Sequence, residues 1–326
     1  DRLLDSQAKI VITSNELYGR IKKIRHQLPD LKQVIVVGKT NLDNGDLPFE
    51  SISNYPESFE TVISSPDDNA FMLYTSGSTG KPKGIIHAHR SITQQVSSFR
   101  QVFNIQPTDN YWCTADTGWI TGVSYILVAP IATGTTTIFF EGRFDPEIWY
   151  SIIQDQKVNV LYTAPTALRM LKAANLDTTQ FDFSSLRLIG SVGEPLNTEV
   201  IFWAQKVFNK TILDTWFQTE LGSITISNRQ DFPVKPGSMG KPLSNIQAKI
   251  VDDNFDSVPE NTLGHLVVHP ENTSIMKEVW QNQNKYNSYF KNGWYQTGDI
   301  ASVDSDGYFF FSGRSDDIIN TQGERV

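Results

Sequence analysis

The chain has 326 residues, with 39% hydrophobic and 11% aromatic side chains and a formal net charge of −8. This composition excludes a largely disordered chain and allows one large domain or two smaller ones. Because proteins that bind nucleic acid or acidic membranes are usually basic, we expect neither kind of partner. Cys113 is the single cysteine, which excludes an internal disulfide. With no signal peptide or membrane-length apolar run in the sequence, we expect a cytoplasmic protein.

The N-terminal region has the pattern of a strand, a helix and a second strand. Residues 10–13 predict a buried strand, apolar residues at helical spacing run from 17 to 28, and residues 34–37 predict the second strand. This order predicts a βαβ-like unit. Segment 40–68 is rich in Asn, Asp, Ser and Pro, and therefore predicts a long loop.

Residues 74–84 lie between two further predicted strands, 71–74 and 84–89, and contain three glycines, four Ser/Thr hydroxyls and two lysines. Glycine lets the backbone approach a ligand closely, hydroxyls and N–H groups donate to phosphate oxygens, and lysine supplies positive charge. Thr75 and Pro82 stand where a Walker A loop needs glycine and Ser/Thr, so the loop is of another kind. Composition alone fits a flexible surface loop equally well, but the order of the residues favours a polyphosphate-binding loop.

Strand and helix patterns alternate from residue 91 to about 235. Ser91 is expected to cap a helix with Phe99 and Phe103 on one face, and Asp145-Pro146 to start another helix. Strands are predicted at 111–115, 135–140, 158–162, 186–190 and 211–215. This alternation predicts an α/β fold whose mostly parallel sheets are covered by helices.

Beyond Gly237 the pattern changes to short strands separated by Gly, Pro, Asn and Asp. Strands are predicted at 248–251, 265–269 and 308–311, and residues 304–307 predict a hairpin turn. We therefore expect a small β-rich, barrel-like subdomain appended to the α/β body. The resulting division is 1–69 (partial α/β), 70–235 (nucleotide- and acyl-binding α/β), 236–312 (β-rich) and 313–326 (hinge).

Two motifs lie at the ends of predicted strands, where open α/β sheets bind their ligands. They are Gly190-Ser191-Val192-Gly193-Glu194-Pro195 and Asp214-Thr215-Trp216-Phe217-Gln218-Thr219-Glu220. The adjacent Thr219 and Glu220 offer oxygen ligands of the kind that Mg²⁺ prefers. Either motif alone also fits a turn or core packing.

Two more motifs follow in the β-rich region. In Trp294-Tyr295-Gln296-Thr297-Gly298-Asp299, the carboxylate of Asp299 can accept hydrogen bonds from both hydroxyls of a ribose. In Gly313-Arg314-Ser315-Asp316 and the later Gly323-Glu324-Arg325, arginine offers a planar fork that suits phosphate or ribose oxygens. Without the other motifs, these would be an Asp in a β-turn and an exposed charged turn.

In this order, the motifs resemble the signature of the adenylate-forming superfamily, which includes acyl-CoA synthetases, luciferases and peptide-synthetase adenylation domains. The resemblance runs from about Phe71 to the last residue and is nearest to acetyl-CoA synthetases and other short-chain acyl-CoA ligases. It implies the large N-terminal domain of such an enzyme, with ATP, Mg²⁺ and CoA as cofactors and AMP as product.

The resemblance also implies roles for single residues. Nucleotide contacts would come from Thr75, Ser76, Gly77, Ser78, Thr79, Gly80, Lys81, Gly193, Glu194, Pro195, Asp214, Thr215, Trp216, Gln218, Thr219, Asp299, Arg314 and Arg325. Catalytic roles would fall to Thr79, Lys83, Thr219, Glu220 and Arg325, with Glu220 as the magnesium ligand. Asp316 matches the hinge to a mobile C-terminal domain, and because almost nothing follows it, we expect the chain to be a fragment without that domain.

Phe217 carries the expectation about the acyl group. Most of the superfamily has glycine at this point, and acetyl-CoA synthetases resemble one another in placing tryptophan there, which closes the acyl channel. Phenylalanine also fills space, and the other wall residues would be Ile120, Thr121 and Val192, none of which is charged. The predicted pocket suits a very short carboxylic acid. One methylene is worth only about 1–3 kcal/mol of discrimination, so propionate is expected beside acetate.

The resulting prediction is an AMP-forming ligase that activates acetate or another short-chain carboxylate to acyl-AMP and transfers the acyl group to CoA. Two alternatives stay open. One is an amino-acid adenylation domain that loads a carrier protein, in which Asp116 would hold the substrate ammonium. The other is a module that binds ATP or AMP without catalysis.

Overall fold

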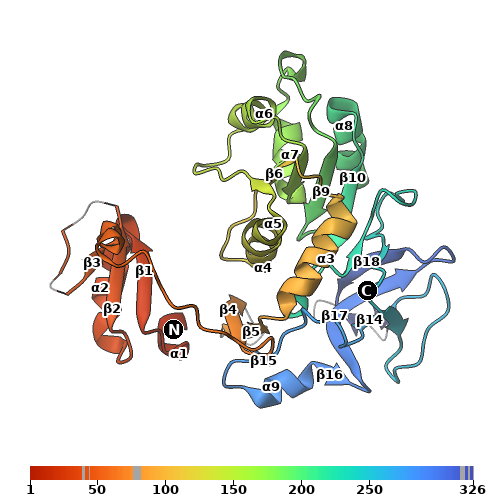
Figure 1. The fold of residues 1–326 in the computed structure, drawn as a ribbon. Helices are drawn as coiled ribbons and strands as arrows, with labels where there is room; N and C mark the ends of the chain where they lie inside the picture. The colour runs from red at the N-terminus through yellow and green to blue at the C-terminus, as the bar shows by residue number, and fades with distance from the viewer. Residues whose placement is uncertain (39–40, 44, 76–81, 316–319, 322–323, 326) are drawn as a thin grey trace. The chain divides into compact units, whose positions relative to one another are not determined.

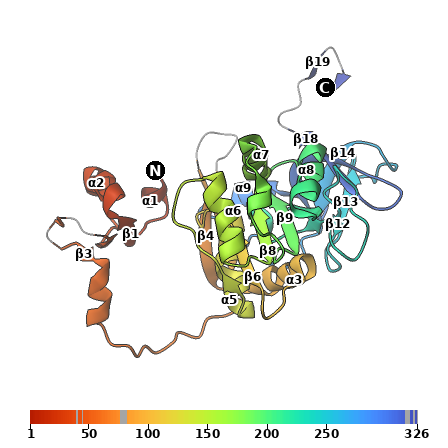
Figure 2. The ribbon, with the colours of Figure 1, turned by 90° about the horizontal axis from the view of Figure 1, so that it is seen from above.

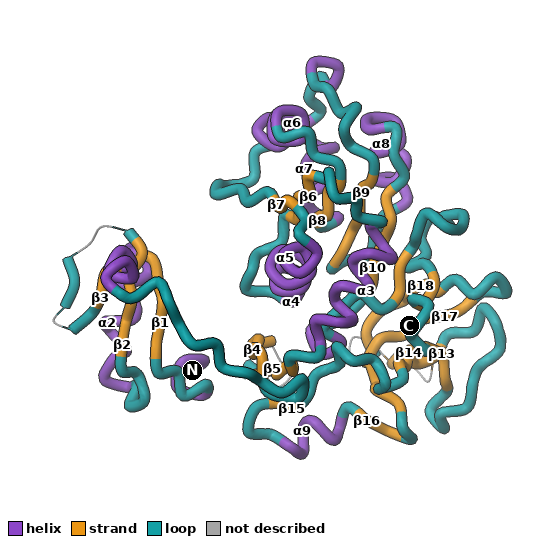
Figure 3. Tube along the Cα trace, viewed as in Figure 1, coloured by secondary structure: helices purple, strands orange, loops and turns teal. Residues whose placement is uncertain are grey.

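The structure is a computed structural model, and it describes residues 1–38, 41–43, 45–75, 82–315, 320–321 and 324–325. The chain forms two compact units, Asp1–Ser65 with Tyr74–Gly84, and Pro66–Leu73 with Ile85–Val326. Figure 1 labels the elements, and Figure 3 shows which segments are helix, strand or loop.

The first unit is built on the predicted βαβ arrangement. Strand β1 (Ile10–Ser14), helix α2 (Asn15–Ile24) and strand β2 (Gln33–Val37) follow one another, and β1 pairs in parallel with β2. The expectation of a buried β1 is wrong, because Ile10 and Ile12 are 58% and 61% exposed while Val11 faces inward. Segment 40–68 is not loop throughout, since it contains β3 (Leu47–Pro48) and the 3₁₀ helix η2 (Phe49–Asn54).

The second unit is centred on a seven-stranded sheet. Its strand order is β12-β11-β10-β9-β8-β6-β7, in which β7, β6, β8, β9 and β10 run parallel and β11 and β12 run antiparallel. The bounds are β6 (Asn110–Cys113), β7 (Thr136–Thr137), β8 (Val160–Thr163), β9 (Leu188–Val192), β10 (Ile212–Trp216), β11 (Ile226–Ser227) and β12 (Lys241–Pro242). The strand predicted at 135–140 is thus much shorter than expected. The α/β prediction is confirmed.

Helices cover both faces of this sheet, as Figures 1 and 2 show. On one face, α6 (Pro146–Asp155), α7 (Pro165–Ala174) and α8 (Thr198–Phe208) pack through a shared apolar core. On the other face lie α3 (Ser91–Phe103) and α5 (Ala129–Thr133). Asp145 caps α6 as predicted, whereas the cap of α3 is Arg90 and not Ser91, which is already the first helical residue.

The C-terminal part contains the predicted β-rich region as a curled antiparallel sheet. Its strands are β13 (Ala248–Val251), β14 (Gly264–Val268), β16 (Phe290–Lys291), β17 (Trp294–Val303) and β18 (Phe309–Arg314), in the order β13-β14-β17-β16 with β18 also paired to β17. The predicted turn joins β17 to β18, with the Gly307 N–H donating to the Asp304 carbonyl at 3.0 Å.

The remaining elements are short or connect these layers. A separate three-stranded sheet consists of β4, β5 and β15, and a two-stranded one of β19 and β20. The bounds are α1 (Arg2–Asp5), η1 (Arg25–Gln27), β4 (Asn69–Thr75), β5 (Lys83–Ala88), α4 (Ile120–Gly122), η3 (Val123–Val128, a π-helix), η4 (Thr178–Gln180), η5 (Thr219–Leu221), β15 (Glu278–Val279), α9 (Gln283–Ser288), β19 (Asn320–Thr321) and β20 (Glu324–Arg325).

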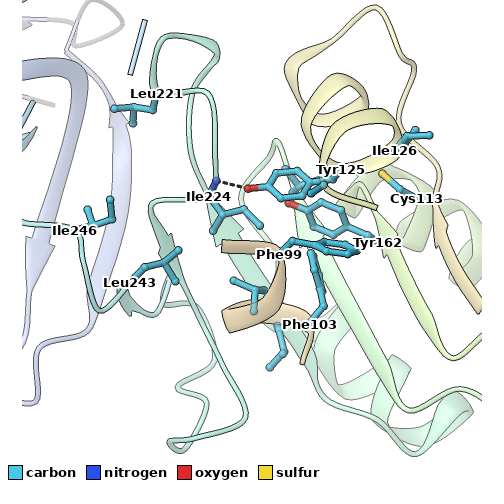
Figure 4. Packing of buried hydrophobic residues seen from close by; sticks show 14 of the residues in the cluster. Phe99, Phe103, Cys113, Tyr125, Ile126, Tyr162, Leu221, Ile224, Leu243 and Ile246 are labelled. Atoms are coloured by element: carbon cyan, nitrogen blue, oxygen red, sulfur yellow. Dashed lines mark hydrogen bonds between the residues drawn. The ribbon is translucent and has the colours of Figure 1, made fainter. Parts of the chain in front are cut away.

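One hydrophobic core is shared by the parallel sheet and the residues that follow it. Figure 4 shows Phe99, Tyr125 and Tyr162 packed near Ile224, and the backbone N–H of Ile224 donates to the Tyr125 hydroxyl at 2.6 Å. The same cluster continues to Ile246 and, in the β-rich sheet, to Val268 and Tyr295. The sheet and the β-rich region are therefore joined by buried apolar surface.

Candidate active site

A cavity of about 270 Å³ lies at the carboxyl ends of β9 and β10, against β17 and β18. It is lined by Gly193, Glu194, Pro195, Leu196, Asp214, Thr215, Trp216, Phe217, Gln218, Gly237, Met239, Asp299, Phe311 and Arg314. Three separate sequence motifs, those around residues 193, 214 and 299, thus meet at one cavity together with Arg314. The location agrees with the rule that open α/β sheets bind ligands beyond the carboxyl ends of their strands.

Asp299 lies at the centre of a hydrogen-bond network on one wall of this cavity. Its Oδ2 accepts from Trp216 Nε1 at 2.9 Å and from Gln218 Nε2 at 3.2 Å, and its Oδ1 accepts from Arg314 at 2.8 Å. The carboxylate is buried, and burial raises its pKa, while these donors oppose that rise. The network fixes the orientation of Asp299 and joins it to Trp216, which also lines the cavity.

Asp214 is the second acidic residue of the cavity and has a different environment. Its Oδ1 is buried without a hydrogen-bond partner among the described residues. Burial raises the pKa of Asp214 to about 7, far above its ordinary value of 3.8. The next residue, Thr215, donates its hydroxyl to the Ser191 carbonyl at 2.7 Å and so ties β10 to β9. Hydrogen bonds to Ser191 and Thr215 oppose this rise in the pKa of Asp214 without cancelling it.

Glu194 also lines the cavity, on the loop between β9 and α8. Its carboxylate accepts from the Thr166 hydroxyl at 2.7 Å and forms an ion pair with Arg169 at 2.5 Å. Burial alone would raise the pKa of Glu194, but Thr166 and Arg169 lower it overall. Both partners belong to α7, so this pair fixes the loop to the neighbouring helix.

Thr219 and Glu220 begin the short helix η5, directly after the cavity-lining segment. The ring nitrogens of His87 lie 2.8 Å from the Thr219 carbonyl oxygen and 3.0 Å from that of Ser274. Burial lowers the pKa of His87 to about 4, and the two carbonyl contacts oppose this fall. His87 thus joins η5 to the segment that contains Ser274. Gly222 ends η5 with φ +73°, and a Cβ there would lie 2.3 Å from the Ser274 carbonyl oxygen.

The four residues predicted to form an acyl pocket are only partly brought together. Phe217 lines the cavity, and its ring meets that of Tyr125 edge-on with centroids 5.6 Å apart. Val192 belongs to the same hydrophobic core as these two rings. Ile120 and Thr121 lie in α4 and do not line the cavity. Their part in an acyl pocket remains a prediction.

Several predicted residues cannot be placed against the cavity. Ser76, Gly77, Ser78, Thr79, Gly80, Lys81 and Asp316 lie outside the described residues, and so does the side chain of Arg325, whose backbone is in β20. Thr75 ends β4 with a buried hydroxyl, and Lys83 begins β5; both belong to the first unit. The predicted phosphate loop therefore stays a prediction.

Residues 1–280 match the family model described as AMP-binding enzyme. The chain belongs to the AMP-binding enzyme family. It is 45% identical over 333 residues to the acetyl-coenzyme A synthetase of Bacillus subtilis (strain 168), covering 100% of this chain and 57% of that protein. It is 38% identical to the acetyl-coenzyme A synthetase of Pasteurella multocida (strain Pm70), covering 100% of this chain and 54% of that protein.

A solved structure of a CoA ligase has the same fold. The crystal structure of the anthranilate CoA ligase AuaEII in complex with anthranoyl-AMP superposes with a TM-score of 0.91 at 32% identity, covering 100% of this chain and 62% of that one. The chain thus spans between about half and two thirds of the length of these relatives. The predicted superfamily and fold class are confirmed.

Sequence reasoning missed several residues that shape this candidate site. Arg169, Tyr125, Tyr289 and Tyr295 make the contacts that hold Glu194, Phe217, Glu220 and Gln218, respectively. Tyr295 lies inside a motif that drew attention for its aspartate alone, and the other three lie in no motif.

In the part of the chain that the structure describes, no helix is long and apolar enough to cross a membrane.

Proposed function

We propose that the protein to which this chain belongs activates acetate or propionate with ATP and transfers the acyl group to CoA. The observation that carries this proposal is the cavity in which Asp299, Trp216 and Phe217 meet at the end of β10. Membership of the AMP-binding enzyme family and the similarity to two acetyl-coenzyme A synthetases support it.

The proposed chemistry has two steps. In the first, a carboxylate oxygen of the acid forms a bond to the α-phosphorus of ATP, and the bond to the pyrophosphate oxygen breaks. In the second, the CoA thiol gives up its proton and forms a thioester at the acyl carbon, and AMP leaves. Both steps bring reactants together in a fixed geometry and need no protein nucleophile.

Five of the cavity residues have roles in this proposal. Asp299 accepts the ribose hydroxyls, and Arg314 contacts the ribose or phosphate oxygens. Trp216 packs beside the adenine, and the loop of Glu194 borders it. Phe217 closes the acyl end, where the edge-on contact with Tyr125 holds its ring and leaves room for a short acid.

Mg²⁺ is part of this proposal because ATP is bound as its magnesium complex. Among the described residues, no three or more His, Cys, Asp or Glu side chains gather to hold a metal ion. A Mg²⁺ at this site would take most of its ligands from phosphates and water, which is its usual mode, with Glu220 as a protein ligand and Thr219 at the α-phosphate. Bound Mg²⁺ supplies positive charge that offsets the negative charge of the phosphates.

The test is acyl-chain preference, measured on the longer protein that contains this chain. AMP release with acetate, propionate, butyrate and hexanoate should be fastest with the two shortest acids. Phe217→Gly should extend the accepted chain to butyrate or longer and raise the relative rate with these acids at least about ten-fold, because a removed ring leaves space for several methylenes.

Phe217→Leu is the matched control, because it keeps most of the side-chain volume and should keep the preference for short acids. A Phe217→Gly enzyme that still uses acetate alone would contradict the assignment of the acyl pocket. Pyrophosphate exchange with amino acids but not with acetate would contradict the proposed substrate class and favour a carrier-loading enzyme.

A further inference from the structure

Two stacked tyrosines, Tyr289 and Tyr295, contact the segment Gln218–Glu220 and are not among the residues that line the cavity. The rings of Tyr289 and Tyr295 are 5.8 Å apart at 21°. Tyr289 directly precedes β16, and Tyr295 is on β17, where it pairs with Phe290 across the hairpin. The hairpin therefore brings two residues that are six apart in sequence into face-to-face contact.

Each tyrosine donates its hydroxyl to a different residue of that segment. The Tyr289 hydroxyl lies 3.1 Å from Glu220 Oε1, and the Tyr295 hydroxyl lies 2.9 Å from Gln218 Oε1. A phenol donates readily to a carboxylate or amide oxygen, and a hydrogen bond to a charged group is stronger than one between neutral groups. The stacked pair thus holds Glu220 and Gln218 at once.

Gln218 connects Tyr295 to Asp299 through hydrogen bonds of its side-chain amide. Because its Oε1 accepts from Tyr295, its Nε2 faces the other way and donates to Asp299 Oδ2 at 3.2 Å and to the Thr297 carbonyl at 2.9 Å. Without the Tyr295 hydroxyl, the amide could rotate and present its oxygen to the carboxylate, which would repel it. The Tyr295 hydroxyl, which does not reach the cavity, therefore helps to select the amide orientation in which Gln218 donates to Asp299.

We propose that Tyr289 and Tyr295 are positioning residues for the AMP-binding site. Tyr289 orients the proposed magnesium ligand Glu220, and Tyr295 orients the proposed ribose contact Asp299 through Gln218. The stacked rings couple the two, so that the metal end and the ribose end of the nucleotide are held in one arrangement. This inference rests on the proposed function, since it assigns the partners of a bound nucleotide.

The experiment removes each hydroxyl and keeps each ring. Binding of ATP to the purified chain is measured by calorimetry in EDTA and again with Mg²⁺, and binding of AMP is measured in EDTA. Tyr289→Phe should lower the gain in ATP affinity that Mg²⁺ brings by about three- to ten-fold and leave AMP binding within two-fold, as expected for one hydrogen bond to a charged group. Tyr295→Phe should weaken AMP binding by a similar factor.

Tyr286→Phe is the matched control. Tyr286 lies on the neighbouring helix α9 and packs on Phe290 with ring centroids 5.0 Å apart, and its hydroxyl is not among the donors to Gln218 or Glu220. This variant should change neither measurement. If the tyrosines had a merely structural role, both variants would have a lower melting temperature. The loss of the magnesium-dependent gain in ATP affinity and the loss of AMP affinity would then occur together in each variant.

Three results would overturn the inference. The first is a Tyr289→Phe chain with the full magnesium effect, and the second is a Tyr295→Phe chain with full AMP affinity. If Tyr295→Phe does not fold, Gln218→Met breaks the same link and should weaken AMP binding; full AMP affinity of that variant then takes the place of the second result. The third is a wild-type chain that binds no nucleotide, which overturns the proposed function and the inference together, whereas the first two leave the proposed function standing.

Discussion

Asp299 and Asp214 line the same cavity and differ in the hydrogen bonds that their carboxyl groups accept. Asp299 accepts hydrogen bonds from Trp216, Gln218 and Arg314, which favour the ionised form. Asp214 has a buried Oδ1 with no partner among the described residues, and burial raises its pKa to about 7. We therefore expect the raised pKa of Asp214 to make the free energy of unfolding depend on pH near neutrality.

The prediction for Asp214 concerns stability between pH 6 and pH 8. Its folded pKa of about 7 is above its ordinary value of 3.8, so the folded state binds a proton that the unfolded state has lost. Stability from this group is complete below the ordinary pKa and is lost as pH rises through 7. Urea unfolding should show the wild type losing about 1.4 kcal/mol more than Asp214→Asn from pH 6 to pH 8.

Asp155→Asn is the matched control for this measurement, because Asp155 is an exposed carboxylate at the end of α6. It should show the wild-type dependence on pH. An Asp214→Asn chain whose stability follows that of the wild type at every pH would contradict the raised pKa of Asp214.

At the scale of the element, the starts of α6 and α3 show when a local sequence signal is sufficient to predict the N-cap of a helix. Asp145 caps α6 because its backbone is extended and its Oδ1 accepts from the N–H groups of Glu147 and Ile148. Ser91 has the right chemistry for a cap, but Arg90 before it already has near-helical angles, with φ −59° and ψ −19°. The cap moves by one residue because the turn that leads into α3 is set by its contacts with segment 66–68.

The cap of α6 allows a direct test. Asp145→Ala should lower the free energy of unfolding by about 1 kcal/mol, because two N–H groups of the first turn lose their acceptor. Asp145→Asn keeps an acceptor oxygen and should lose much less. Denaturant unfolding of the three proteins measures the difference. Equal losses for the two variants would show that the charge of Asp145, and not its capping oxygen, stabilises the helix.

At the scale of the whole second unit, the hydrophobic core crosses the boundary predicted at residue 235. Phe99 and Tyr162 of the α/β region belong to the same cluster as Ile246, Val268 and Tyr295 of the following region. Buried apolar contact of this kind makes neighbouring parts unfold together. The division at 235 remains a prediction about sequence organisation, and the shared core favours a single cooperative unit.

The corresponding prediction is that the parallel sheet and the β-rich sheet of the second unit unfold in one transition. Hydrogen exchange under increasing denaturant should give the same opening free energy for amides of β9 and of β14, within about 1 kcal/mol, because both strands contribute to the shared core. Near-ultraviolet circular dichroism should follow the same midpoint. A β-rich sheet that exchanges several kcal/mol earlier would show that the shared core does not couple the two regions.

The sequence by itself determined the order of elements, the fold class and the main motifs. These depend on short-range patterns, such as the spacing of apolar residues, Asp-Pro at a helix start and the turn at residues 304–307, and such patterns act within a few residues. It also placed the motifs around 193 and 214 at the ends of predicted strands, and the family resemblance implied that these motifs and Asp299 contact one nucleotide. Exposure of Ile10 and Ile12 was not predictable, since an apolar run does not say how many faces of a sheet are covered.

Only the tertiary structure decided which side chains hold the candidate site in place. The hydrogen bond from Tyr289 to Glu220 joins residues 69 apart, and that from Trp216 to Asp299 joins residues 83 apart. No local pattern encodes these pairs, because they arise where the β-rich hairpin packs against the end of the parallel sheet. The motifs identify which residues can contact a nucleotide, and the packing of distant elements decides how firmly those residues are held.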